Sequence, residues 1–247
     1  MVHIEMELDV TVRRHGPVVI VHPRGTLTLR TATDLRRVLR RELLHHGRVI
    51  VDLDGFRLGP QACWVMIFPT VLAECGGWPA AKIALCRPDA EMSQALATLE
   101  VPALVPAYHL QLEAKAEIDR RPDVVRLQTG LPADVSASAT ARRMIRDTCP
   151  LWQVDHDLQD TAQVVVNELV DVASGPAGTA AELILERGPL GLRLAVADAP
   201  STRPEQRATD PLHKGLGLGM EMLGNLTTSW GVDVAPDRTT AWAVIIN

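Results

Sequence analysis

Two patterns of hydrophobic residues alternate in the first 120 residues: short apolar runs, and apolar residues at helical spacing. Apolar runs at 18–21 and 49–51 are typical of buried strands. Between these runs, four apolar residues recur at helical spacing: Leu35, Val38, Leu39 and Leu43. This spacing predicts an amphipathic helix with an arginine-rich, solvated face, and Thr31 and Asp34 are placed to cap its N-terminus.

The alternation continues to residue 118. It predicts a helix, a strand, a helix, a short strand and a helix at 61–74, 82–85, 89–99, 104–106 and 110–118. Strands that alternate with helices predict an α/β unit, with one sheet and helices packed against it. The charged segment 119–122 ends in proline and predicts a linker. We therefore expect one domain at 1–120 and a second at 124–247.

The second region begins with two helical patterns. One covers 135–149, and the other carries a sustained apolar stripe of Leu158, Ala162, Val165, Leu169 and Val172. Strands are predicted at 181–186, 192–197, 229–234 and 239–246, with a helix at 220–226. Helices combined with an antiparallel set of strands predict an α+β sandwich.

Composition narrows the class of protein. The chain has 247 residues, of which 47% are apolar and 22% are charged, so it is globular and not disordered, collagenous or coiled-coil. Residues 1–125 contain 15 basic and 15 acidic residues, and residues 126–247 contain 10 basic and 15 acidic residues. This balance argues against nucleic acid as the main partner. No stretch is typical of a signal peptide or a membrane span, so we expect a cytoplasmic protein without a membrane partner.

The sequence gives little support for a metal site or for a nucleophilic cysteine. The four cysteines, Cys63, Cys75, Cys86 and Cys149, show no spacing typical of a zinc site or a disulfide framework, and buried free thiols are expected. The pair His45-His46 is more typical of a solvated loop than of a metal site. We expect no resident metal and no nucleophilic cysteine.

A glycine run is the one short motif suited to phosphate. Gly215, Gly217 and Gly219 alternate with leucines just before a predicted helix. Glycines let backbone N–H groups approach an anion, and a helix N-terminus favours negative charge. A tight turn with close helix packing explains the same residues, so the run alone does not decide between the two interpretations.

Five short motifs follow one another in a recognisable order. They are Glu168-Leu169-Val170-Asp171-Val172-Ala173, Asp198-Ala199-Pro200 with Pro204, Gly217-Leu218-Gly219-Met220, Trp230-Gly231 and Thr240-Ala241-Trp242-Ala243. This succession, over about 120 residues, resembles the histidine-kinase-like ATPase domain of anti-sigma factor serine kinases. The resemblance implies that Glu168 is the base and that Asp198 hydrogen-bonds the adenine. It also implies nucleotide contacts from Gly215, Gly217, Leu218, Gly219 and Thr240.

Two positions depart from that family. The asparagine that holds magnesium falls at Val172, which offers no oxygen ligand. Asn167 and Asp171 lie on another side of the same helix, and neither replaces the lost ligand. Pro176 stands where the family carries a histidine. The resemblance leaves ATP or ADP binding open, and Val172 argues against a magnesium site and against phosphoryl transfer.

The first region resembles a second family. Val51-Asp52-Leu53-Asp54-Gly55-Phe56 and Pro23-Arg24-Gly25-Thr26-Leu27 resemble the STAS domain of anti-sigma factor antagonists, over about residues 5–118. The family's phosphorylated serine falls at Gln61, which has no hydroxyl and is a poor mimic of phosphoserine. Pro60 is suited to the first helical position. Trp64, beside the switch position, could lie at an interface.

These observations leave three hypotheses. The first is a regulatory protein of a partner-switching pathway that binds a sigma factor, an anti-sigma factor or an antagonist, with degenerate sites at Gln61 and Val172. The second is an active ATP-dependent serine/threonine kinase with Glu168 as its base. The third is a structural or dimerising module, such as a homodimer.

Overall fold

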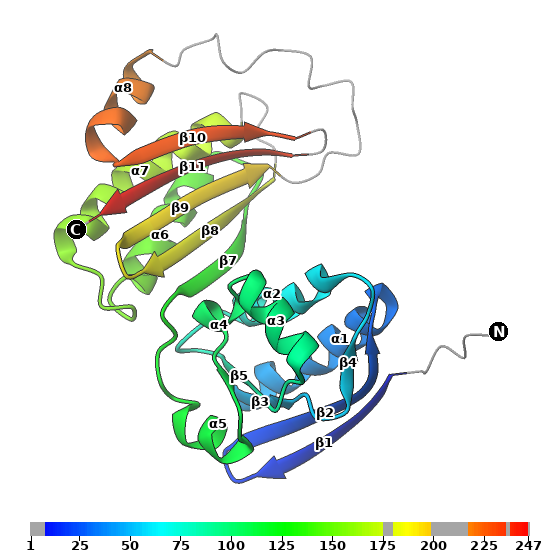
Figure 1. Cartoon of the computed structure of the whole chain (residues 1–247). Coiled ribbons are helices and arrows are strands. Elements are labelled where there is room, and N and C mark those ends of the chain that lie inside the picture. Colours follow the sequence, from blue (N-terminus) through cyan, green and yellow to red (C-terminus); the bar gives the residue numbers. More distant parts are fainter. Residues whose placement is uncertain (1–7, 175–179, 199–216, 236–237, 247) are drawn as a thin grey trace. The chain divides into compact units, whose positions relative to one another are not determined.

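A computed structural model describes residues 8–174, 180–198, 217–235 and 238–246 of the chain. The chain divides into two compact units, Met1–Val125 and Arg126–Asn247 (Figure 1). Each unit has its own sheet and its own helices. We call them unit 1 and unit 2 and describe each by itself.

Unit 1 is built on one mixed sheet. Its strands are β1 (Asp9–His15), β2 (Val18–Leu27), β3 (Arg48–Asp52), β4 (Phe56–Leu58), β5 (Lys82–Cys86) and β6 (Ala107–Tyr108). Their order is β1-β2-β3-β5-β6, and β4 pairs with the end of β2. Only β1 and β2 run antiparallel; the other pairs are parallel. Parallel neighbours need crossover connections, which the helices of unit 1 supply.

Helices cover both faces of this sheet. The helices are α1 (Leu29–His46), η1 (Ala62–Met66), α2 (Ile67–Glu74), α3 (Ala90–Thr98), α4 (Val101–Leu104) and α5 (Gln111–Glu117). Val19 and Val21 of β2 pack with α1 and α2 in the larger core, whereas Val18 and Ile20 pack on the opposite face with Ala114 of α5. The predicted α/β class of the first region is therefore confirmed.

Two local predictions in unit 1 are wrong. Helix α1 is capped by a reciprocal pair one turn earlier than predicted: Thr31 N donates to Thr28 Oγ1 at 3.4 Å, and Thr28 N donates to Thr31 Oγ1 at 2.8 Å. Asp34 instead pairs with Arg37. The strand predicted at 104–106 is displaced, because α4 runs to Leu104 and β6 begins only after Pro106, which has no N–H for a ladder.

The segment predicted as a linker is tied to unit 1. Asp119 accepts a hydrogen bond from Arg48 Nε at 2.9 Å and pairs with Lys82 Nζ. Val124 N donates to Ala103 O at 2.8 Å. No helix or strand covers 119–122, but these bonds hold both ends of the segment.

Unit 2 combines one five-stranded sheet with three helices in the part of the chain that is described. The strands are β7 (Val125–Leu131), β8 (Ala181–Gly188), β9 (Gly191–Asp198), β10 (Ser229–Val234) and β11 (Thr239–Ile246), in the order β10-β11-β9-β8-β7. The pairs from β10 to β8 are antiparallel. Helices α6 (Ala137–Thr148) and α7 (His156–Ser174) pack together, α7 lies against β9 and β11, and α8 (Gly217–Leu226) contacts α7 and β10.

The helices and antiparallel strands predicted for the second region are confirmed, but strand β7 was missed. Its buried residues Val125, Leu127 and Leu131 do not follow strict alternation to the end, and the strand directly follows the supposed linker. The apolar stripe of α7 is buried at Leu158, Ala162, Val165 and Leu169. At its C-terminal end Ala173 is buried and Val172 is only partly buried, because a straight helix drifts from a strict seven-residue repeat.

Within the described ranges, none of the helices is both long enough and apolar enough to cross a membrane.

Candidate functional site

Position 61 lies at the start of a short helix on the surface of unit 1. Gln61 is the N-cap of η1 and is exposed, and its Oε1 accepts a hydrogen bond from Trp64 Nε1 at 2.9 Å. Pro60 therefore lies before the helix and does not occupy its first turn. The side chain at this position is an amide that is hydrogen-bonded to a neighbouring indole, and it carries no hydroxyl.

The backbone before Gln61 is fixed by a close approach to β2. Gly59 N donates to Leu27 O at 3.1 Å. A Cβ on Gly59 would lie 2.2 Å from that same oxygen, which is closer than real Cβ atoms come. A glycine is therefore required here, and it anchors the segment that presents position 61.

The cysteines differ in exposure. Cys63 is exposed, which contradicts the expectation of buried thiols, whereas Cys86 and Cys149 are buried. Burial raises the pKa of the Cys86 thiol to about 12 and that of Cys149 to about 11. These two thiols are protonated near neutral pH and are poor nucleophiles.

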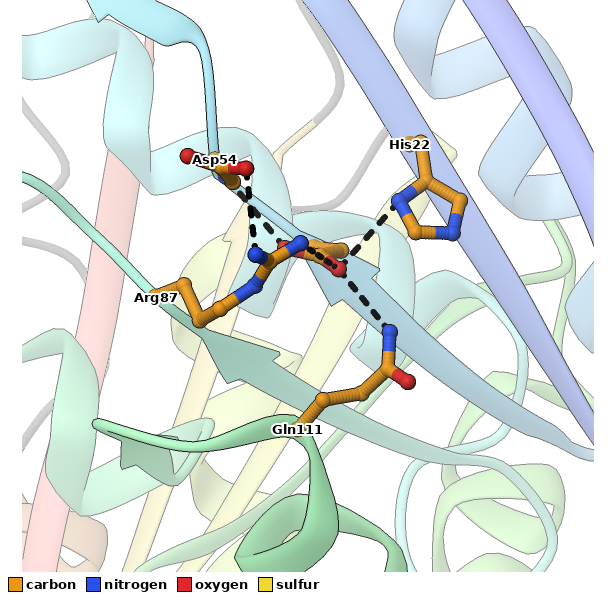
Figure 2. Close-up of polar contacts among 5 residues, drawn as sticks. His22, Asp54, Arg87 and Gln111 are labelled. Carbon is orange, nitrogen blue, oxygen red and sulfur yellow. Dashed lines mark hydrogen bonds and ion pairs between the residues drawn. The ribbon is translucent and has the colours of Figure 1, made fainter.

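A polar cluster lies next to the turn that leads to β4 (Figure 2). We call it the Asp52 cluster; its members are His22, Asp52, Asp54, Arg87 and Gln111. Arg87 donates to both carboxylate oxygens of Asp52, from Nε to Oδ1 at 2.9 Å and from Nη2 to Oδ2 at 2.6 Å. Gln111 Nε2 donates to Oδ2 at 2.9 Å, and His22 Nδ1 lies 3.2 Å from the same atom. Arg87 Nη1 also reaches Asp54 at 3.0 Å.

Asp52 is an ionised carboxylate in the interior of unit 1. Its side chain is 0% exposed. Burial opposes its ionisation, but the hydrogen bonds from Arg87 and from the Asp54 amide, with the charge of Arg87, hold the pKa of Asp52 below its ordinary value. A buried carboxylate with this many donors is a structural group whose charge is fully compensated.

The cluster fixes the turn before position 61. It joins β2, the end of β3, the β3–β4 turn, the residue after β5 and the first residue of α5. Arg87 has a φ of 55°, an uncommon backbone conformation for a residue with a side chain. The sequence motif around Asp52 indicates neither Arg87 nor Gln111, because these residues lie 35 and 59 residues away along the chain.

In unit 2, two of the predicted nucleotide residues come from paired strands. Asp198 ends β9, and its Oδ1 accepts a hydrogen bond from Thr239 N at 2.5 Å. Thr240 lies opposite Ala197 in the β9–β11 pair. Glu168 is half-buried on α7, the helix that packs on both of these strands.

Three residues of α7 lie at or near the family's metal-ligand position: Asn167, Asp171 and Val172. Arg142 Nη1 of α6 donates to Asn167 Oδ1 at 2.7 Å, Asp171 is exposed, and Val172 is partly buried. Among the described residues, no group of three or more His, Cys, Asp or Glu could hold a metal ion. Asn167 therefore already binds Arg142, and the side chain of Val172 carries no oxygen.

Some predicted residues lie outside the described part of the chain. These are Gly215, Pro176 and residues 177–179 and 199–214. Helix α8 begins at Gly217, three residues earlier than predicted, so Gly217 and Gly219 lie in its first turn and not before the helix. The nucleotide contacts expected from this run stay a prediction.

Comparison with known proteins found no matching family model and no matching curated protein. Solved structures do align with parts of the chain. One, described as an anti-sigma factor antagonist from Thermotoga maritima, covers 45% of this chain and 95% of its own at 16% identity, with a TM-score of 0.38. An anti-sigma factor antagonist from Mycobacterium paratuberculosis covers 45% and 94% at 15% identity, with a TM-score of 0.38.

A third structure holds the RsbU and RsbW domains of a Mycobacterium tuberculosis protein. It aligns with 49% of this chain and 32% of its own at 17% identity, with a TM-score of 0.35. TM-scores of 0.35 to 0.38 do not decide the fold or the function of either unit.

Proposed function

We propose that this protein is a regulator in a partner-switching pathway and acts by binding a sigma factor, an anti-sigma factor or an antagonist. Unit 1 serves as a STAS-like binding domain, and unit 2 as a histidine-kinase-like ATPase domain. Association, and not phosphorylation of unit 1, carries the signal.

The observation that carries this proposal is the state of position 61. Gln61 is exposed at the start of η1, where a STAS antagonist presents its phosphorylated serine, and its side-chain oxygen is hydrogen-bonded to Trp64. The Asp52 cluster and Gly59 hold the preceding backbone in place. A fixed backbone that presents a side chain without an acceptor hydroxyl at position 61 supports constitutive binding that phosphorylation at this position cannot switch off.

Affinity capture with the full chain tests this function. We expect it to recover a sigma factor, an anti-sigma factor or an antagonist, and recovery of none of these contradicts the proposal. Trp64→Ala should weaken capture, because it removes the indole beside position 61. Leu190→Ala is the control, since Leu190 is 82% exposed in the β8–β9 turn and belongs to unit 2.

An active kinase is the second candidate. It is supported by Glu168 on α7 and by Asp198 at the end of β9, because both family positions keep a carboxylate. Transfer of label from γ-labelled ATP to any protein target would favour the kinase over the first proposal. We expect no transfer.

Calorimetry with ATP, with and without magnesium, measures whether nucleotide binding depends on magnesium and so tests the role of Val172. We expect any binding to the natural chain to be independent of magnesium. Val172→Asn supplies an amide oxygen at the family's ligand position and should introduce magnesium dependence. Magnesium-dependent binding by the natural chain would contradict the assignment of Val172 as a degenerate site.

A further inference from the structure

The solvent side of α1 is a continuous basic stripe. Six exposed residues fall within one sector of the helix: Arg30, Thr33, Arg37, Arg40, Arg41 and Leu44. Arg37 pairs with Asp34, and Arg41 pairs with Glu42, whereas Arg30 and Arg40 have no ion pair with any described residue. The first and last members are 14 residues apart, which is about 21 Å along a helix. We call this set the α1 stripe.

The solvent side of α7 has the opposite charge over the same length. Its outward sector contains Asp157, Asp160, Val164, Glu168 and Asp171, all of which are exposed except the half-buried Glu168. The sequence of α7 contains no lysine or arginine. Its first and last stripe members are again 14 residues apart, about 21 Å. We call this set the α7 stripe. The neighbouring helix α6 exposes Arg143 and Arg146, so the acidity belongs to α7 and not to all of unit 2.

Both stripes place like charges close together. Solvated helix faces usually intersperse opposite charges at i, i+3 and i, i+4, where they attract, and Asp34 with Arg37 and His156 with Asp160 are such pairs here. The same spacings also join like charges, as in Arg37 with Arg41 and Asp157 with Asp160. Like charges at these distances repel each other and destabilise the helix. A surface of opposite charge would relieve the repulsion in both helices.

We propose that the α1 stripe of one copy of this chain binds the α7 stripe of a second copy. The occupant is a second copy because the chain itself carries both halves, with equal length and opposite charge. Each stripe also exposes one aliphatic side chain, Leu44 at 60% and Val164 at 38%, which the contact would bury. Two copies that exchange the contact form a closed dimer, and a one-way contact adds further copies. The proposal does not depend on the partner-switching function.

Sedimentation velocity of the full chain tests the proposal. We expect self-association at about 50 mM salt that weakens at about 500 mM, because salt screens charges on exposed surfaces. Arg37→Glu with Arg40→Glu should weaken association about tenfold or more, and so should Asp157→Arg with Asp160→Arg.

Mixing the two double variants gives the sharpest result. The first variant has two of the four arginines of its α1 stripe reversed and the second has two of the four carboxylates of its α7 stripe reversed, so the contact is weakened in each variant alone. In the mixture the natural α7 stripe of the first variant faces the natural α1 stripe of the second, and we expect association to return. Restoration on mixing also rules out misfolding as the reason for the loss. Arg13→Glu with Arg14→Glu, on the exposed part of β1, makes the same charge change off the stripe and should leave association unchanged.

Three outcomes overturn the proposal. They are a monomer at every soluble concentration, equal association of the variants and the natural chain, and a mixture that fails to associate. A monomeric chain whose α1 stripe binds RNA or anionic vesicles would likewise replace the second copy by another partner.

Discussion

Two aspartates end strands in the two units, and their surroundings differ sharply. Asp52, at the end of β3, is fully buried and receives hydrogen bonds from Arg87, Gln111 and the Asp54 amide. Asp198, at the end of β9, is only partly buried and accepts a hydrogen bond from the Thr239 amide. The same residue type at the same kind of position is therefore fully buried in unit 1 and only partly buried in unit 2.

The largest expected effect separates these two aspartates. Asp52→Asn removes a buried charge that Arg87 and Gln111 are arranged to meet, and we expect a loss of about 3 kcal/mol in the free energy of unfolding of unit 1. Asp198→Asn keeps an oxygen for the Thr239 amide and should cost less than about 1 kcal/mol. Urea denaturation of the full chain measures both. Similar losses from the two variants would contradict the distinction between them.

The next contrast concerns two glycines. Gly59→Ala places a Cβ against Leu27 O, and we expect it to destabilise unit 1 by about 1–3 kcal/mol through overpacking. Gly130→Ala is the matched control, because a Cβ there meets nothing within 4 Å. Thermal unfolding of both variants should show a lower midpoint for Gly59→Ala only. An unchanged midpoint for Gly59→Ala would mean that the segment before Gln61 is not fixed by β2.

A pH dependence should distinguish the Asp52 cluster from the rest of unit 1. Burial lowers the pKa of His22 below its ordinary value of 6.5, against the attraction of Asp52; the charges of Arg13, Arg87 and Arg24 add to the lowering. Folding thus favours neutral His22, and this part of the stability is present above pH 6.5 and is lost as the pH falls through the lowered pKa.

Hydrogen exchange of the β3 amides as a function of pH measures this effect. We expect protection to decrease on acidification below pH 6.5, and His22→Gln, which cannot titrate, should remove that part of the decrease. His45→Gln, at the exposed end of α1, is the control and should leave the profile unchanged. An identical profile for His22→Gln and the natural chain would exclude His22 as the titrating group.

The smallest expected effect is at the degenerate switch position. Gln61→Ala removes one exposed hydrogen bond to Trp64, so we expect a loss of no more than about 1 kcal/mol. The same urea measurement applies. A loss as large as that of Asp52→Asn would show that Gln61 holds unit 1 together, and the surface would then be structural.

Most of the regular elements could be predicted from the sequence, because their signals are local. The three buried leucines of α1 that recur at helical spacing, Leu35, Leu39 and Leu43, and the two apolar runs of the β8–β9 hairpin are set by neighbours along the chain. The failures occur where distant contacts decide. Strand β7 is defined by its place in the sheet beside β8, and the α1 cap depends partly on Thr31 Oγ1 bonding to Thr26 O at 2.6 Å, in β2.

What the sequence determined by itself is which atoms stand at each position. An amide without a hydroxyl occupies position 61 and a hydrocarbon occupies position 172, and no fold can change those groups. Only the tertiary structure decided which polar groups meet. Asp52, Arg87 and Gln111 are joined because β3 and β5 end where α5 begins. The identity of a side chain is local, whereas its distance from another side chain depends on the whole chain.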